Sequence, residues 1–460
     1  MKRTSIFPTW CRLTLLACVL AVAALLWARH HRGRAEYERR IAALRAAGEP
    51  VTASELAARY PDPPPERDFR RLLRSLLPAG SSPAADPPIG DVSAVLERVR
   101  ALSNREPFAP ELSEQARVGL ADNAATVELL LRTDLAGFGL LHQWQTSGWT
   151  NNSDRDGDKI FVRIMLCRTL AMQAAYEAEI GHSQRAATAL VRGYQVARLP
   201  GHVGIISAVG QLACESTMQP AVERTLNRAA LTDDDLRRLG EALPRPSDLL
   251  LETMLTERGY QIYWWNDPVV SSLSLEGVSV ANPTLKHAQY RVGHLLRGYD
   301  GRLQLLDRWA DRVAVTRLPM REQLAAIAAS QSKVFQIRAS QTNFASRLQK
   351  CWDVDYGLLG LTEPKVIYLF NTNAVDLAGL ANAQAAVAIE RWRLVHPGRL
   401  PDTLAELVPA YLAAVPLDPY DGQPVRYKKL PVGYVVYSVG MGWTDQGERS
   451  GSAITLTVER

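Results

Sequence analysis

The stretch LTLLACVLAVAALLWA, from Leu13 to Ala28, carries no charge in a chain of 460 residues. As an α-helix it is about 24 Å long, slightly less than the hydrocarbon core of a bilayer. Trp10 and Trp27 border it, and tryptophan favours the membrane–water interface. We therefore expect residues 1–33 to form a basic N-terminal segment and an uncleaved, single transmembrane helix.

Two other interpretations of this stretch stay open. Ala21-Val22-Ala23 has the small residues of a signal-peptidase site, although the chain stays apolar after it. Leu15-Leu16-Ala17-Cys18 resembles a bacterial lipobox, although the apolar run continues past the cysteine. Either event would replace the transmembrane anchor with a shorter mature chain.

Basic residues lie on both sides of the apolar stretch. Lys2, Arg3 and Arg12 precede it, and five arginines follow it in residues 29–40. The positive-inside rule applied to this count places the C-terminal part in the cytoplasm. A resemblance near the C-terminus, described below, favours export instead. In both cases the arginines predict contact with anionic lipid headgroups.

The composition is that of a globular protein, with 47% hydrophobic and 22% charged residues. The formal charge of +5 is spread thinly, without a basic run interleaved with aromatic residues, so we expect no nucleic-acid partner. Cys167, Cys214 and Cys351 lie beyond the anchor, and no C-x-x-C motif occurs. We expect buried thiols rather than zinc or dithiol chemistry.

The sequence predicts a mainly α protein with four segments. After residues 1–33, residues 34–90 begin with a helix-prone stretch and end in a Pro-rich linker. Residues 91–362 repeat apolar positions at helical spacing between Gly- or Pro-bearing turns, which predicts an irregular, solenoid-like array of helical hairpins. Residues 363–460 predict a long helix after Pro364 and then a small antiparallel sheet, forming an α+β module.

Four motifs follow one another near the C-terminus. They are G-R-L-P at 398–401, L-A-E-L-V-P at 404–409, P-L-D-P-Y-D-G-Q-P at 416–424 and Y-V-V-Y-S-V-G at 434–440. With the preceding helix, this order resembles the globular part of the major pseudopilins of type II secretion. The resemblance covers residues 388–440 and implies a module that works outside the cytoplasm.

The chain departs from pseudopilins at its N-terminus. Phe7 follows Ile6 rather than the glycine of a prepilin processing site, and the apolar stretch contains no glutamate. We therefore expect no pilus assembly. Pseudopilins bind calcium after the S-x-G strand, and the resemblance implies Asp418, Asp421 and Asp445 as calcium candidates, with ordinary turn-forming aspartates as the alternative.

Another string has the residue types of a calcium loop. Asn152, Asp154, Asp156 and Asp158 place oxygen ligands at alternate positions, as in the first half of a helix–loop–helix calcium site. The twelfth position should be a bidentate glutamate, but it is Arg163. The alternative is a solvated acidic turn between helices.

Two further groups are open to a structural and a functional interpretation. His287 and His294 lie seven residues apart, so they could share one face of a helix and bind a metal ion. The alternative is that both are surface histidines. An aromatic cluster predicts either a binding groove or interior packing. The cluster consists of Tyr260, Tyr263, Trp264, Trp265 and Asp267.

No hydrolase elbow, phosphate-binding loop or dinucleotide fingerprint occurs in the sequence. The layout, with the segment ASELAARYPDPPPE at Ala53 to Glu66, resembles a group of uncharacterised bacterial membrane-anchored proteins. We expect a non-enzymatic binding or scaffold protein of the cell envelope, without a cofactor. Its large C-terminal part would be periplasmic, and its partners would be membrane lipid and envelope proteins. The alternatives are an accessory component of a secretion system and a membrane-tethered hydrolase whose site is assembled from distant residues.

Overall fold

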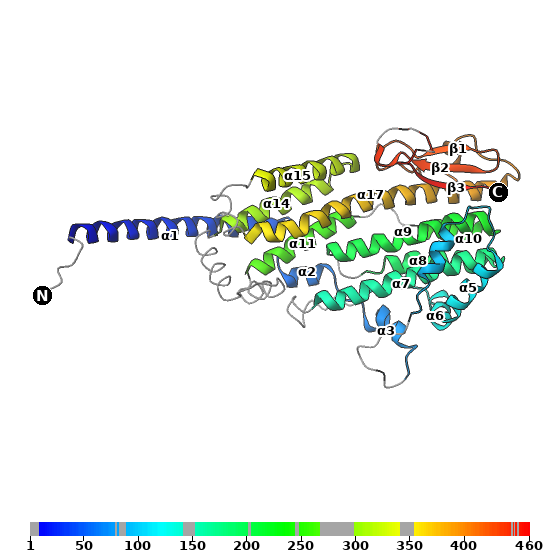
Figure 1. Cartoon of the computed structure of the whole chain (residues 1–460), viewed down its shortest axis with the longest axis horizontal. Helices are drawn as coiled ribbons and strands as arrows, with labels where there is room; N and C mark the ends of the chain where they lie inside the picture. Colours follow the sequence, from blue (N-terminus) through cyan, green and yellow to red (C-terminus); the bar gives the residue numbers. More distant parts are fainter. Residues whose placement is uncertain are drawn as a thin grey trace. The chain divides into compact units, whose positions relative to one another are not determined.

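The computed structural model shows a mainly helical chain with a long apolar helix at its N-terminus and a small antiparallel sheet at its C-terminus (Figure 1). This confirms the fold class predicted from the sequence. The described residues are 9–78, 81, 89–140, 152–200, 204–243, 248–266, 299–340, 354–442, 445, 447–448 and 450–460.

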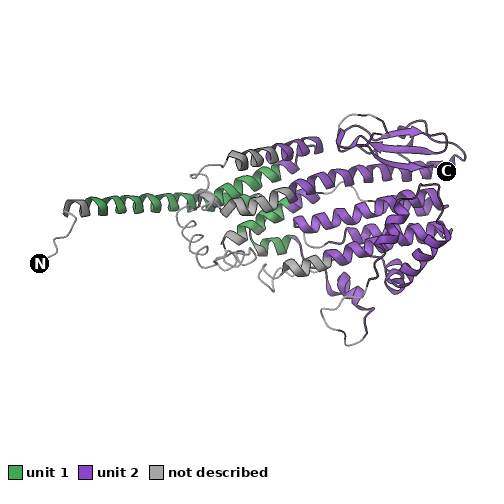
Figure 2. Cartoon of the chain, viewed as in Figure 1, with its two compact units in different colours: residues 1–59, 254–314, 332–364 green, residues 60–253, 315–331, 365–460 purple. Residues whose placement is uncertain are grey.

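The chain forms two compact units, and neither is continuous in sequence (Figure 2). The first unit consists of residues 1–59, 254–314 and 332–364. The second unit consists of residues 60–253, 315–331 and 365–460. The domain boundaries predicted from the sequence follow changes in composition, whereas these two units are defined by packing. The predicted boundaries stay a prediction.

Helix α1 (Thr9–Ala46) runs unbroken from the apolar stretch into the first unit (Figure 1). Its residues from Leu13 to Leu25 are exposed, and α1 is long and apolar enough to cross a membrane. Its second half is charged, and Arg34 pairs with Glu38 at 2.7 Å one turn away. The helix ends before Gly48, which has a φ of 72° that favours glycine.

The first unit has a small core between α1, α2 (Ala53–Arg59), most of α11 (Leu249–Asn266) and α14 (Asp300–Thr316). The buried side chains of this core are Tyr37, Val51, Ile262 and Leu306. Gly33 permits a close approach, because a Cβ there would lie 2.9 Å from the Cβ of Tyr299. The C-terminal half of α1 is thereby held in the core of the first unit.

Local capping signals decide where several helices begin. Thr52 precedes α2, and its Oγ1 accepts from the backbone N–H of Glu55 at 3.2 Å. Thr232 caps α10 (Asp233–Ala242) in the same way through Asp235. Both caps form because a hydroxyl at this position satisfies an otherwise unpaired backbone donor.

Three long helices form the centre of the second unit. They are α7 (Asn152–Glu179), α8 (Ser183–Ala197) and α9 (Ile205–Arg228), and they pack against one another (Figure 1). A turn at Gly181, which has a φ of 84°, joins α7 to α8. Four shorter helices belong to the same unit: α3 (Phe69–Arg74), α4 (Ser93–Arg100), α5 (Pro110–Ala121) and α6 (Ala124–Arg132).

The longest helix, α17 (Val354–Val395), differs from the sequence prediction at its start. It was expected to begin after Pro364, but Pro364 lies inside it. Proline removes one backbone donor and disfavours a helical turn before it, and the turns on both sides form here nonetheless. Helix α15 (Met320–Ser340) lies before it in the chain.

The C-terminal sheet has the order β1 (Arg426–Lys429), β2 (Tyr434–Ser438), β3 (Ile454–Val458), and all pairs are antiparallel. The central strand β2 is buried along its whole length. The hydroxyl of Tyr434 donates to a carboxylate oxygen of Glu390 on α17 at 2.9 Å. The sheet is thus attached to α17 by a buried hydrogen bond as well as by apolar packing.

Candidate functional site

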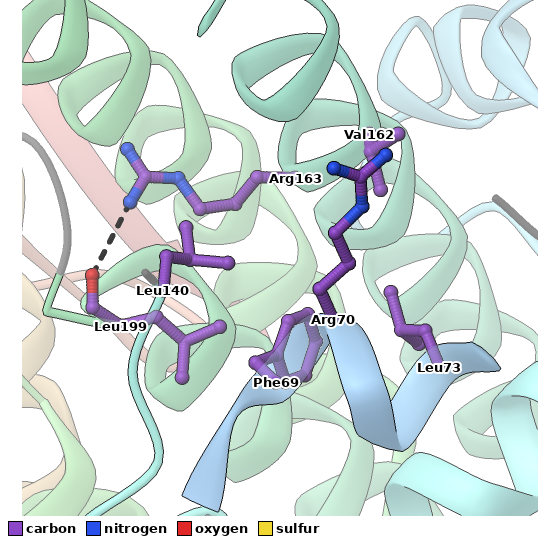
Figure 3. Close-up of a pocket in the computed structure, with 7 residues that line it drawn as sticks. All are labelled: Phe69, Arg70, Leu73, Leu140, Val162, Arg163 and Leu199. Carbon is purple, nitrogen blue, oxygen red and sulfur yellow. Dashed lines mark hydrogen bonds between the residues drawn. The ribbon is translucent and has the colours of Figure 1, made fainter. Parts of the chain in front are cut away.

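A hollow in the second unit lies between α3 and α7, and we call it the α3–α7 pocket (Figure 3). Its volume is about 360 Å³, including the part that is open to solvent. Five apolar and two arginine side chains line it: Phe69, Leu73, Leu140, Val162, Leu199, Arg70 and Arg163. Its enclosed part has room for little more than a water molecule, which is well below the size of a typical small-molecule site.

Backbone pairing between distant segments builds the pocket. The N–H of Phe69 donates to the carbonyl of Gly139 at 2.9 Å, and the N–H of Leu140 donates to the carbonyl of Pro200 at 2.7 Å. Asp68 caps α3 by accepting from the backbone N–H of Arg70 at 3.0 Å. Three segments far apart in the sequence are therefore fixed around one apolar hollow.

Arg163 is the unusual residue of the pocket wall, because its side chain is 5% exposed. Its Nη atoms donate to the carbonyls of Leu199 at 3.4 Å and Ser207 at 3.3 Å, at the long end of hydrogen-bond lengths (Figure 3). Its Nε has no hydrogen-bond partner in the described part of the chain. A buried guanidinium with so few strong contacts is costly.

Two other buried arginines show the usual arrangement. Arg224 is 4% exposed and pairs with Glu179 at 2.9 Å. Arg258, in the first unit, is 2% exposed and pairs with Glu49 at 2.7 Å. No carboxylate of the described residues forms an ion pair with Arg163.

A buried polar network lies between α8, α9 and α17 in the same unit. Arg198 Nε donates to Glu215 at 2.9 Å, and Gln211 donates to the same carboxylate at 2.8 Å. Gln219 donates to the carboxylate of Asp376 at 3.0 Å. Glu215 and Asp376 are 0% and 2% exposed. Burial, followed by the neighbouring Glu215 carboxylate, raises the pKa of Asp376 well above its ordinary value.

We predict that Asp376→Asn raises the melting temperature by a few degrees at pH 8 and not near pH 4. A carboxyl whose pKa is raised in the folded state contributes its full stability to the fold at a pH below its unfolded pKa of about 4. That contribution is lost as the pH rises through the folded-state pKa. Asparagine can still accept the hydrogen bond from Gln219, and it has no titratable proton. The measurement is thermal unfolding across pH, and the control is the exposed Asp311→Asn. Equal pH dependence of the Asp376 variant and the native chain would contradict the raised pKa of Asp376.

The cysteines beyond the anchor fall into two groups. Cys167 and Cys214 are free and buried, as predicted. Burial, then the hydrogen bond with Cys214, raises the pKa of Cys167. The same hydrogen bond, and more weakly the Arg163 guanidinium, lowers the pKa of Cys214. Cys351 lies outside the described residues.

The first predicted calcium string has a helical backbone. Asn152, Asp154, Asp156 and Asp158 lie in the first turns of α7 rather than in a turn between helices. Their side chains lie outside the described part of the structure. A helical backbone does not carry alternate residues to one centre as a calcium loop does.

The second set of calcium candidates surrounds an arginine. Arg426 donates to Asp418 at 3.0 Å and to Asp421, and its Nε lies 3.6 Å from Asp445. Asp418 is fully buried and also accepts from the backbone N–H of Val439 at 2.8 Å. The guanidinium therefore supplies a positive charge inside the chain at this position.

The remaining sequence candidates cannot be placed in a site. His287, His294 and Asp267 lie outside the described residues. The aromatic residues of the cluster lie on the backbone of α11, but their side chains are outside the described part of the structure. These side chains are Tyr260, Tyr263, Trp264 and Trp265. Among the described residues, no group of three His, Cys, Asp or Glu side chains is arranged to hold a metal ion.

The pocket and the polar network were not found from the sequence. The one available signal for the pocket was Arg163, a charged residue on an otherwise apolar helix face near Ile164 and Leu170. It was interpreted as position twelve of a calcium loop instead. Comparisons of the chain with protein-family models, with curated proteins and with solved structures found no match.

Proposed function

We propose that this chain is a single-pass membrane-anchored protein of the cell envelope that binds a ligand or partner without catalysing a reaction. Its large C-terminal part is on the exported side. The observation that carries the proposal is the apolar stretch of α1 from Leu13 to Leu25, whose side chains are exposed. Each large aliphatic side chain kept in water forfeits about 1.5–3 kcal/mol of burial, and a lipid bilayer supplies that burial.

The residues after the apolar half suit a membrane surface. Trp27 is 65% exposed at the end of the apolar run. Arg29 and Arg32 follow within two turns, where their charges meet anionic headgroups. The ring of His30 also lies 5.2 Å from that of Tyr299, which belongs to the first unit. This supports a first unit that begins at the headgroup level.

The binding role is supported by the α3–α7 pocket, which combines an apolar lining with a buried cation. Export is supported by the resemblance of residues 388–440 to a module that works outside the cytoplasm. The experiment that tests the placement fuses alkaline phosphatase or a fluorescent protein after Arg460. Phosphatase activity without fluorescence is the expected result, and the reverse would overturn export.

We predict that Leu20→Arg sharply reduces membrane integration. Leu20 is 60% exposed near the centre of the apolar run, where replacing leucine with arginine costs about 3 kcal/mol. The measurement is the fraction of chain that remains in the carbonate-washed membrane pellet. The matched control is Val118→Arg on α5, where the side chain is 47% exposed. A native chain found in the supernatant would overturn the anchor.

A second candidate is an accessory component of a secretion system. It is favoured by the combination of the pseudopilin-like motif order with a long helix, α17, that carries a three-stranded antiparallel sheet. The test is a cysteine-crosslinking scan of exposed positions such as Leu417 and Val432 against secretion proteins in intact cells. Adducts with a secretion component support this candidate, and a scan without adducts counts against it.

A further inference from the structure

We propose that Cys167 and Cys214 form an intramolecular disulfide that fastens α7 to α9 when the chain folds in an oxidising compartment. This inference rests on the exported placement in the proposed function, because disulfides persist in exported domains and are rare in the cytoplasm. The segment between the two cysteines contains the whole of α8, so the bond closes a loop at the centre of the second unit (Figure 1). No C-x-x-C motif signals this pair, because its members come from different helices.

Contacts near both ends of α7 and α9 show that the two helices run parallel. Near their starts, a Cβ on Gly210 would lie 2.6 Å from the side chain of Ile160, which is 50 positions earlier in the chain. Near their ends, Arg224 and Arg228 pair with Glu179, which is 45 and 49 positions earlier. The two cysteines are 47 positions apart, so this register brings them to the same level of the helix pair.

The helix faces that carry the cysteines have small side chains. Ala171 and Ala174 follow Cys167 on the same face of α7, and all three are 0% exposed. Gly210 precedes Cys214 by one turn on α9. Small side chains let two helix backbones approach closely, and a disulfide needs Cα atoms within about 7 Å of each other. The packing of α7 on α9 therefore suits a covalent bond at this level.

The sulfur of Cys167 lies where the three central helices meet. Its Sγ is 3.7 Å from the carbonyl oxygen of Gly193 on α8. A Cβ on Gly193 would collide with the side chain of Met218, which lies one turn after Cys214 on the same face of α9. The two thiols also share a hydrogen bond, and both are reduced in the structure. The sulfur atoms are therefore neighbours inside the core.

The bond forms by thiol–disulfide exchange with an oxidant that itself carries a disulfide, either a small molecule or an exported protein. The thiolate of one cysteine attacks this disulfide, which gives a mixed disulfide and releases one thiolate of the oxidant. The other cysteine then loses its proton and attacks the first cysteine, which forms the Cys167–Cys214 bond and releases the second thiolate. The chain loses two protons and two electrons, and the oxidant is reduced to two thiols. Because both cysteines are fully buried in the folded chain, the oxidant meets them before this core closes.

The experiment maps the cysteines of the full-length chain taken from intact cells. The cells are quenched with acid and denatured in N-ethylmaleimide, which blocks every free thiol, and the chain is digested without reductant. Mass spectrometry should find a linked pair of peptides that carry Cys167 and Cys214, with neither residue alkylated.

A second arm separates the disulfide from the exported placement. The purified full-length chain is reduced in urea and detergent, and it is then refolded with a mixture of reduced and oxidised glutathione. If the linked pair forms there while both cysteines are alkylated in the sample from cells, the exported placement is overturned and the pairing stands. If both cysteines are alkylated in the two samples, the disulfide is overturned whatever the placement.

Two variants test whether the bond fastens the helices. Reductant should lower the melting temperature of the native chain by about 5 °C, because a closed loop restricts the unfolded chain. Cys214→Ser cannot form the bond, so reductant should leave its melting temperature unchanged. The matched control, Cys351→Ser, should keep both the linked pair and the sensitivity to reductant. An equal shift in Cys214→Ser would contradict the bond, and if that variant does not fold, the peptide map of the native chain decides.

Discussion

Gly433→Ala is expected to destabilise the C-terminal sheet by about 2–4 kcal/mol. Gly433 forms the turn between β1 and β2 with a φ of 80°, a left-handed conformation that costs other residues about 1 kcal/mol or more. A Cβ at this position would also collide with the carbonyl oxygen of Val458, so β3 would have to move away. Thermal or denaturant unfolding of the native and variant chains measures the loss.

Two other glycines provide the matched controls. Gly398 and Gly422 have φ values of 71° and 73°, but a Cβ on either would meet no atom within 4 Å. Their alanine variants carry the conformational cost alone, of about 1 kcal/mol. If all three variants lose the same stability, the collision with Val458 does not exist in the folded chain.

Asp418→Ala is expected to be the most damaging substitution of a polar residue in the C-terminal module, at about 3–5 kcal/mol. The Asp418 carboxylate is fully buried and accepts from Arg426, from the hydroxyl of Ser438 at 2.9 Å and from the backbone N–H groups of Tyr420 and Val439. Alanine removes this acceptor from the buried Ser438 hydroxyl and the two backbone N–H groups, whereas Arg426 keeps its contact with Asp421. Unfolding of the variant chain measures the loss.

An exposed acid provides the comparison for Asp418. Asp402 pairs with Lys429 at 2.6 Å, but its side chain is 84% exposed, so Asp402→Ala should destabilise the chain far less than Asp418→Ala. Calcium gives a second comparison. Because Arg426 already occupies the centre of the three aspartates, added calcium should leave the melting temperature unchanged. A calcium-dependent rise would show that the ion displaces the guanidinium.

Much of the local structure could be predicted because it depends on neighbouring residues. The cap at Thr52, the cap at Thr232 and the turn at Gly181 each follow from the chemistry of one short segment. The alternating strands of the C-terminal sheet were also predicted from their own pattern. Pro364 shows the limit, because α17 continues through a residue whose own preference is to begin or end a helix.

The candidate site could not be predicted because it depends on distant residues. The α3–α7 pocket is formed when Phe69, Leu140 and Leu199 lie around Arg163. No local sequence pattern predicts these contacts between distant residues. The Glu215–Asp376 pair likewise joins α9 to α17. A carboxylate in an apolar helix gives no sign in the sequence of the second acid beside which it will be buried.

The unbroken course of α1 has a mechanical consequence. Because its hydrogen-bonded turns continue from Thr9 to Ala46, the helix works as a rigid strut rather than a flexible tether. Gly33 meets Tyr299 about 9 Å along the axis beyond Trp27, so the strut sets the height of the first unit above the lipid. A tilt or rotation of the strut would turn the first unit with it, and a glycine-rich insertion after Trp27 would uncouple the two motions.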